Sequence, residues 1–369
     1  MKKFLIVLIG IMMALSLVGC GSNSSDDSKE TAESTSQTTD SNEEKVTVAL
    51  LLPYIGDQSY FDVTYNSFKL IEEKYGDQIE TKLIEMGSDE AGWASANLQA
   101  AQEGYDIIIS GNFQYESYML EAAEQFPDIT YINFDYSDAE LNDLPNVYGL
   151  TYKSEQIGYL AGIVAAVKTE SNTVGAIGGM EINSIKQFLG GFIQGALAVN
   201  PDIDIKVGFV GDFTDTGKMK EIALNMNKQG ADVIWHAAGG AGNGLFEAAA
   251  EAGFYAIGVD TDQYASLSSK PELAKTIITS ATKNCDIAIL SAIDLYMEGK
   301  LPLGTLVSLG YKENGVGLAE NDYYNEVLSE EEKTEINKFT EDLKNGNVTV
   351  IDVSVDSAQW DTLIDKISK

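Results

Sequence analysis

Short apolar runs rich in β-branched residues alternate with longer amphipathic stretches along most of this chain. In the first half, the runs "KVTVALLLP", "ETKLIEMG", "YDIIISG" and "ITYINFD" predict strands, and helices are expected from about Tyr60, Ala91 and Tyr115. Strands that alternate with helices are typical of a parallel sheet covered by helices on both faces. This half therefore predicts a doubly wound α/β lobe.

The alternation begins again after "NVYGLTY" and the helical stretch "KSEQIGYLAGIVAAVK". Strands are predicted at "NTVGAIGG", "IDIKVGFVG", "ADVIWHAAG" and "FYAIGVD". They are followed by "AKTIITSATK", a helix "NCDIAILSAIDLYMEG", the segment "GVGLAE", a charged helix near Ser329–Asn345 and a strand "VTVIDVS". Two such series predict two similar lobes, lobe I over residues 45–152 and lobe II over 153–280. Residues 281–369 are expected to cross over and complete the lobes.

The first 44 residues lie outside this alternation. Lys2 and Lys3 precede an apolar run that stops at small residues, which is typical of an export signal, here residues 1–19. A membrane-spanning helix is the alternative. However, the run from Phe4 to Val18 is shorter than the roughly 20 residues that a span needs. We therefore expect this segment to direct export and to form no part of the fold.

The tetrad Leu-Val-Gly-Cys at residues 17–20 resembles the lipobox of bacterial lipoproteins. The resemblance implies that Cys20 is acylated and becomes the mature N-terminus, which anchors the protein by lipid at the extracytoplasmic face of the cell membrane. Residues 21–44 contain almost no apolar side chain and predict a flexible tether between the lipid and the folded body.

The charge balance narrows the choice of ligands and partners. The 369 residues include 57 Asp and Glu against 24 lysines, with no arginine, for a formal net charge of −33. Such a chain repels polyanions, so nucleic acid is not an expected partner. Arginine usually provides the bidentate clamps for carboxylates and phosphates, so its absence favours a neutral ligand. With His236 as the one histidine and Cys285 as the one cysteine besides Cys20, a zinc site built on several such ligands is excluded.

Residues 231–260 place a strand, a glycine cluster, a helix and a second strand that ends in an acid. This order is close to that of a dinucleotide-binding unit, but Gly240, Gly242 and Gly244 give G-x-G-x-G rather than the complete G-x-G-x-x-G. A loop that brings its backbone close to any ligand needs the same residues, so Gly239 and Gly242 are candidate ligand contacts. The sequence offers no nucleophile with its base, metal cluster or complete cofactor fingerprint. We therefore predict a binding protein without catalytic residues, metal or cofactor, with a hydrolase or dehydrogenase as the less favoured alternative.

Ligands of open α/β sheets bind beyond the carboxyl ends of the strands. In the first half, Asp57, Phe61 and Tyr65 are four residues apart and would share one helix face. They are either ligand contacts or a helix cap with core aromatics, and the spacing alone favours the cap. Asp135 lies at the tip of the fourth predicted strand.

The second half offers four more candidates. Trp235 ends one predicted strand, and Phe188, on a helix after a Gly-Gly turn, faces either the cleft or the core. Asp260 ends the next strand, and Lys283 lies near the expected crossover between the lobes. An acid and a lysine together suit the vicinal hydroxyls of a ribose, and a surface ion pair is the alternative.

From Val46 to about Ser354 the chain resembles the basic membrane protein family, which includes the purine nucleoside receptor lipoproteins. The resemblance rests on "GDQSYFDVTYNSFK", "YLAGIVAA", "FLGGFIQGA", "GADVIWHAAGGAGNG", "IGVDTDQ" and "TSATK". It implies a two-lobed type I periplasmic-binding-protein fold. It also implies the extracytoplasmic binding component of an ABC importer, which takes a nucleoside and passes it to permease subunits. We expect a monomer.

In that family the base is sandwiched between aromatic rings, and an aspartate and a lysine bind the ribose hydroxyls. By motif these two fall on Asp260 and Lys283, the glycine loop on residues 239–244, and an acid that contacts the base on Asp135. The stacking rings would come from the following residues: Tyr60, Phe61 or Tyr65 in lobe I, and Phe188 or Trp235 in lobe II. The family's first motif resembles D-D-K-S-F-N, whereas residues 56–61 read G-D-Q-S-Y-F. A different base, another neutral sugar-like ligand and a sensor role without import therefore stay as alternatives.

Overall fold

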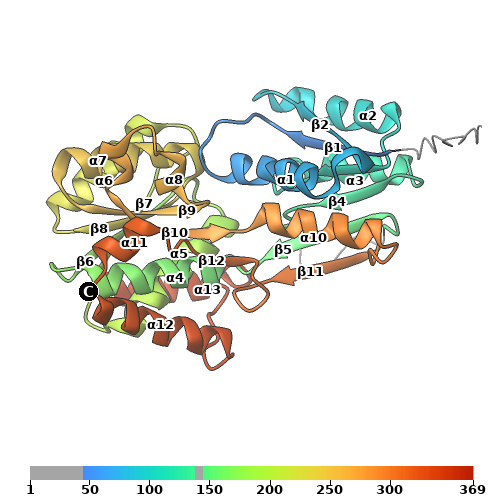
Figure 1. Ribbon diagram of the computed structural model, residues 1–369. Coiled ribbons are helices and arrows are strands. Elements are labelled where there is room, and N and C mark those ends of the chain that lie inside the picture. Colours follow the sequence, from blue (N-terminus) through green and yellow to red (C-terminus); the bar gives the residue numbers. More distant parts are fainter. Residues whose placement is uncertain (1–44, 138–143, 369) are drawn as a thin grey trace, which may run out of the picture. The chain divides into compact units, whose positions relative to one another are not determined.

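Two six-stranded sheets, each flanked by helices, organise the protein (Figure 1). The computed structural model describes residues 45–137 and 144–368; the expected signal at 1–19, Cys20 and the tether at 21–44 lie outside the described residues. The first sheet has the strand order β11 (Thr305–Leu309), β5 (Val147–Tyr152), β4 (Thr130–Asn133), β3 (Ile107–Ser110), β1 (Val46–Leu52), β2 (Ile79–Glu85). The second has the order β12 (Val316–Leu318), β10 (Ile277–Lys283), β9 (Tyr255–Asp260), β8 (Val233–Ala237), β6 (Thr173–Gly178), β7 (Asp204–Phe209).

The predicted α/β fold class is confirmed, since neighbouring strands are parallel in every described pair except β10 with β12. The first sheet packs with α1 (Tyr60–Tyr75), α2 (Trp93–Glu103), α3 (Glu116–Gln125) and α10 (Cys285–Met297), and we call this group lobe I. Lobe II is the second sheet with α4 (Ser154–Lys168), α5 (Asn183–Val199), α6 (Thr216–Lys228), α7 (Asn243–Ala252), α8 (Gln263–Ser266), α9 (Pro271–Ala274), α11 (Asp322–Val327), α12 (Glu330–Lys344) and α13 (Ser357–Ile367). The predicted domain boundaries themselves stay a prediction.

The chain crosses between the two sheets three times. It leaves β5 for α4 at Lys153, leaves β10 for α10 at Asn284, and runs from β11 to β12 through residues 310–315. Hydrogen bonds tie the crossovers together, because Lys153 N donates to Leu309 O at 3.0 Å and Asn284 N donates to Gly315 O at 2.9 Å. The sequence pattern did not reveal β11, which is a short, largely exposed edge strand without an alternating apolar face.

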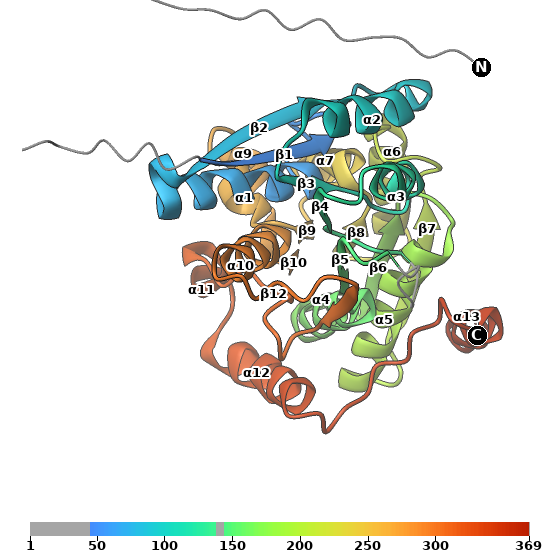
Figure 2. The same cartoon turned by 90° about the vertical axis from the view of Figure 1, so that its right-hand side faces the viewer.

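The strand predicted at "VTVIDVS" is wrong. Residues 348–354 pair with no strand and run between α12 and α13 (Figure 2). Their apolar side chains dock on helix α5 instead: Val353 is buried against Gly190, and the Gln194 side chain bonds both the N–H and the C=O of Ile351. A side-chain amide has the same donor and acceptor as a peptide group, so it replaces the partner strand that the alternating pattern led us to expect.

Helices α4 and α5 approach each other backbone to backbone. Gly158 and Gly162 on α4 face α5, and Gly191 and Gly195 on α5 face α4, each pair spaced four residues apart on one helix face. A Cβ atom at any of these glycines would lie 1.8, 2.2, 2.0 or 2.1 Å, respectively, from a backbone oxygen of the other helix. This contact sets the position of α5, which carries Phe188.

We therefore predict that Gly191→Ala lowers the free energy of unfolding by about 1–3 kcal/mol, because the new methyl group must push the two helices apart. Urea denaturation measures the loss. Gly217→Ala in α6 is the matched control, since the nearest heavy atom to its Cβ is an Asp215 oxygen at 3.4 Å, an ordinary contact distance. It should leave stability unchanged or raise it by up to about 1 kcal/mol. Equal stability of the two variants would contradict the close helix contact.

Candidate functional site

A buried ion pair joins the two lobes. Lys283, the last residue of β10, places Nζ 2.5 Å from Oδ2 of Asp135, which follows β4 in the other sheet. The side chains are only 6% and 18% exposed, and the hydroxyl of Tyr60 donates to the same Asp135 oxygen at 2.8 Å. Three of the predicted site residues therefore meet at one point, although 148 positions separate Asp135 from Lys283.

Three aromatic rings surround the ammonium group of Lys283. Its Nζ lies 5.2 Å from the ring centre of Tyr60, 4.9 Å from that of Tyr152 and 5.8 Å from that of Phe188. These distances are in the range of cation–π attraction. Tyr60 belongs to lobe I and Phe188 to lobe II, so rings from both lobes face the ion pair. We call Tyr60, Asp135, Tyr152, Phe188 and Lys283 the Lys283 cluster.

The charge of Lys283 is stabilised by its neighbours. Burial acts to lower the pKa of Lys283, but the carboxylates of Asp135 and Asp260 outweigh burial and the pKa is raised. A charged lysine with a carboxylate partner is the form in which a buried ammonium group persists in a protein.

Asp260 makes a second contact between the lobes. Its Oδ2 accepts a hydrogen bond of 2.6 Å from the hydroxyl of Ser59, and the side chain of Gln263 donates to the backbone oxygen of Gln58 at 3.0 Å. Asp260 has a left-handed backbone, with φ of 66°, which is uncommon outside glycine and tends to occur at functional positions. Burial raises the pKa of Asp260 to about 6, although Ser59 and Lys283 act to lower it.

Asp57 adopts the cap role that its spacing favours. Its carboxylate accepts hydrogen bonds from the backbone N–H groups of Ser59, Phe61 and Asp62 at 3.0, 2.9 and 3.1 Å, which holds the start of α1.

The three aromatic residues expected in lobe I lie in different surroundings. Phe61 is buried with its ring 5.1 Å from that of Tyr54. Tyr65 is 39% exposed and packs on Phe68. Of the three aromatics expected in lobe I, Tyr60 is the one that contacts Lys283.

Trp235 and the glycine loop have packing roles in the structure. Trp235 is fully buried, stacks on Phe192 with ring centres 5.5 Å apart and donates its indole N–H to Gly258 O at 3.1 Å. Gly242 lies against the buried ring of His236, where a Cβ would come within 1.9 Å of Cε1. Burial lowers the pKa of His236 to about 4, so the ring that Gly242 covers is neutral.

The glycine loop also meets the opposite lobe. A Cβ added at Gly240 would lie 3.7 Å from Cβ of Asp57 in lobe I. Gly239, whose φ is 52°, lies instead against Phe213 of its own lobe, where an added Cβ would be 3.7 Å from Cβ of Phe213. The ring of Phe213 in turn lies 6.1 Å from that of Phe113 in lobe I.

Three residues near the site were not among those predicted from the sequence: Tyr152, Phe113 and Phe213. Tyr152 could have been found, because it too ends a parallel strand.

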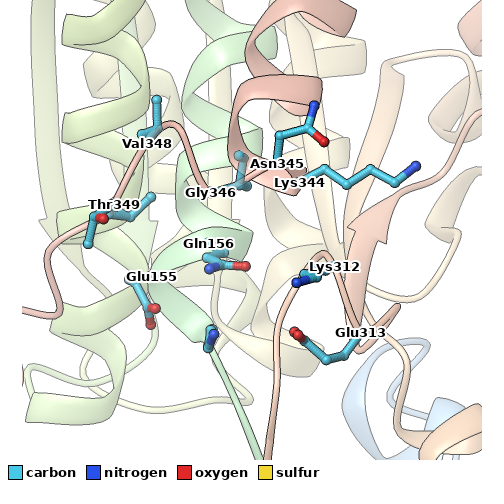
Figure 3. A pocket seen from close by; sticks show the side chains of 12 residues that line it. Glu155, Gln156, Lys312, Glu313, Lys344, Asn345, Gly346, Val348 and Thr349 are labelled. Atoms are coloured by element: carbon cyan, nitrogen blue, oxygen red, sulfur yellow. The ribbon is translucent and has the colours of Figure 1, made fainter.

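A separate cavity of about 340 Å³ lies beside two of the crossovers (Figure 3). Glu155 and Gln156 line it from α4, and Lys312 and Glu313 line it from the crossover between β11 and β12. Burial raises the pKa of Glu155 to about 7, and Gln187 bonds its carboxylate at 2.9 Å. The cavity includes none of the predicted site residues, so we keep it apart from the Lys283 cluster.

Two other kinds of site are absent from the described part of the chain. Within residues 45–137 and 144–368, no group of three or more His, Cys, Asp or Glu side chains is placed to hold a metal ion. In the same ranges, no helix combines the length and the apolar character needed to cross a membrane.

Comparison with known sequences identifies similar proteins. A family model described as "ABC transporter substrate-binding protein PnrA-like" (Bmp) matches residues 45–352. The ABC transporter nucleoside-binding protein BmpA of Lactococcus lactis subsp. cremoris is 31% identical over 264 residues, which make up 68% of this chain and 72% of that protein. Basic membrane protein D of Borreliella burgdorferi is 29% identical over 360 residues, 96% of each chain.

Solved structures confirm the fold. An ABC transporter solute-binding protein of Aeropyrum pernix K1 aligns with a TM-score of 0.73 at 23% identity, covering 88% of this chain and 97% of its own. A solute-binding protein of Conexibacter woesei gives a TM-score of 0.70 at 22% identity, covering 83% of this chain and 99% of its own. The predicted two-lobed type I periplasmic-binding-protein fold is therefore confirmed.

The raised pKa of Asp260 predicts a pH dependence. An aspartate with a folded pKa of about 6 and an unfolded value of 3.8 stabilises the fold below pH 4, and this contribution is lost as the pH rises through 6. Relative to Asp260→Asn, which keeps the shape and tolerates the backbone, the wild type should lose up to about 3 kcal/mol of unfolding free energy between pH 4 and pH 7. Denaturation of both proteins across this range tests it. A difference independent of pH would show that Asp260 titrates normally.

Proposed function

Because the chain belongs to the Bmp family of ABC transporter substrate-binding proteins, we propose that it binds a nucleoside between its two lobes and delivers it to the permease of an importer. One relative carries the name of a nucleoside-binding protein. The observation that carries the proposal is the Lys283 cluster. It brings an acid, a lysine and aromatic rings from both lobes to one buried point.

The chemistry of the cluster suits a nucleoside. Lys283 donates hydrogen bonds, whereas the carboxylates of Asp135 and Asp260 accept them, and ribose hydroxyls can do both. In the bound state, sugar hydroxyls would take over hydrogen bonds that Asp260 now accepts from Ser59. The base would stack on Tyr60 from lobe I and on Phe188 from lobe II, in line with the motif-based expectation.

The charges in the cluster favour a neutral ligand. Lys283 is already paired with Asp135, and Asp260 lies beside them, so an added anion would meet carboxylates rather than a free cation. A ligand without charge can bind by exchanging hydrogen bonds and adds no net charge to the buried site.

Binding would act through closure of the lobes. The crossovers at Lys153, Asn284 and residues 310–315 are the segments about which the lobes can rotate. A ligand that contacts both lobes binds the closed arrangement more tightly than an open one and shifts the population towards it. The permease would then recognise the closed protein.

We further propose that the protein acts outside the cytoplasmic membrane as a monomer, tethered by a lipid on Cys20. The basic and apolar N-terminal run with its lipobox-like tetrad supports the anchor. The polar residues 21–44 would then give the body the reach to find its permease.

Isothermal titration calorimetry of residues 44–369 with inosine, guanosine, adenosine, cytidine, uridine and free ribose tests the ligand. We expect saturable binding of at least one nucleoside. Asp260→Asn should weaken it by about 10-fold or more, because a charge-assisted hydrogen bond to the sugar is lost. The control Asp202→Ala, at an exposed acid of lobe II, should bind as the wild type does. If free ribose binds and no nucleoside does, the ligand is a sugar. The absence of binding heat with every nucleoside would contradict the proposal.

The anchor has its own test. Cys20→Ser in the full-length protein should abolish labelling by a radioactive fatty acid and release the protein from the membrane fraction of cells. Cys285→Ser is the control, because Cys285 is fully buried and should not be acylated. Unchanged labelling of Cys20→Ser would exclude acylation at that residue.

A further inference from the structure

Two tyrosine hydroxyls, one in the Lys283 cluster and one next to it, have no nitrogen or oxygen hydrogen-bond partner among the described residues. They belong to Tyr115 and Tyr152, whose side chains are 0% and 4% exposed. A buried hydroxyl without a partner costs free energy comparable to a lost hydrogen bond, so such groups are rare in folded proteins and need an explanation.

Both tyrosines pack beside the residues that carry the ion pair. Tyr152 ends β5 with its ring 4.9 Å from Nζ of Lys283, and the ring of Tyr115 lies 6.5 Å from that of Phe134, the residue before Asp135. Burial raises the pKa of each well above its usual value, and the charge of Asp135 raises it further. Both groups therefore stay protonated and can donate as well as accept.

The thiol of Cys285 does not satisfy these groups. It is fully buried at the start of α10 and interacts with both tyrosines. Sulfur is a weak donor and a weak acceptor, so contact with it leaves most of the hydrogen-bonding capacity of Tyr152 unused. Tyr60 shows the contrast, because its hydroxyl is fully engaged with Asp135 at 2.8 Å.

We propose that the hydroxyls of Tyr115 and Tyr152 are ligand-binding groups that hydrogen-bond the sugar hydroxyls of the nucleoside. The inference rests on the proposed function and assigns ligand contacts to two residues that the proposed function leaves without one. A tyrosine hydroxyl both donates and accepts, which matches a sugar hydroxyl. Together with the charged groups of Asp135 and Lys283, the two hydroxyls offer a sugar both donors and acceptors.

Tyr131 provides a matched control within the same lobe. Its hydroxyl is also buried and also lacks a partner among the described residues. It packs with Ala49, Leu51 and other residues of a separate apolar cluster, and burial alone raises its pKa to about 12, with no contribution from Asp135. If unpaired tyrosine hydroxyls are simply tolerated in this fold, all three should respond alike.

The test is calorimetric titration of Tyr115→Phe, Tyr152→Phe and Tyr131→Phe. Each is titrated with the nucleoside that the wild type binds most tightly and with its 2′-, 3′- and 5′-deoxy analogues. Each of the first two variants should weaken binding of the parent nucleoside by about three- to tenfold. Each should also bind one particular deoxy analogue as well as the wild type does, because the hydroxyl that it would contact is already gone. Tyr131→Phe should bind every ligand like the wild type.

The outcomes separate this inference from the proposed function. Parent binding within twofold of the wild type in both Tyr115→Phe and Tyr152→Phe overturns the inference while the nucleoside site stands. Equal losses for the parent and for all three analogues also overturn it, since the effect would then be structural. Thermal unfolding of each variant shows whether the fold is kept. If the wild type binds no nucleoside, the proposed function fails and this inference fails with it.

Discussion

The buried pair of Lys283 and Asp135 is the interaction on which the rest of the site depends. A buried ammonium group needs a carboxylate partner, and here each lobe supplies one of the two charges. The pair therefore couples the position of one sheet to that of the other. It also orients Tyr60, whose hydroxyl bonds Asp135, and it draws the rings of Tyr152 and Phe188 around the ammonium group. In the proposed function, recognition of the ligand's polar groups and closure of the lobes would both depend on this contact.

Close helix packing supports the pair in lobe II, and three chain crossovers join this lobe to lobe I. Helices α4 and α5 touch through their backbones at four glycines, residues 158, 162, 191 and 195. This contact fixes the position of α5 and so keeps the ring of Phe188 5.8 Å from Nζ of Lys283. The three crossovers, by contrast, are short segments tied to one another by backbone hydrogen bonds and by the side chain of Asn284. In the proposed function, they are the segments about which the lobes would rotate.

Several features followed from the sequence for reasons that act locally. Alternating strands and helices gave the α/β class, and residues at strand ends gave Asp135, Asp260 and Lys283, because parallel strands all present their carboxyl ends at one edge. The same logic failed where a local pattern had more than one tertiary solution. Residues 348–354 alternate like a strand but dock on α5, and β11 lacks the alternation although it pairs. The glycines near residue 240 stay a predicted ligand loop, and the structure adds that Gly242 makes room for His236.

By itself the sequence determined the two-lobed α/β architecture, the family, the strongly acidic charge and the set of polar residues at the strand ends. Only the tertiary structure decided which of them meet. It chose Tyr60 over Phe61 and Tyr65 as the ring beside Lys283, and it buried Trp235 against Phe192. It also placed the ring of Tyr152 beside Lys283 and that of Tyr115 beside Phe134. The physical reason is that helix and strand periodicity act over a few residues. The partner of a buried charge or ring depends instead on how two sheets, distant in the sequence, pack against each other.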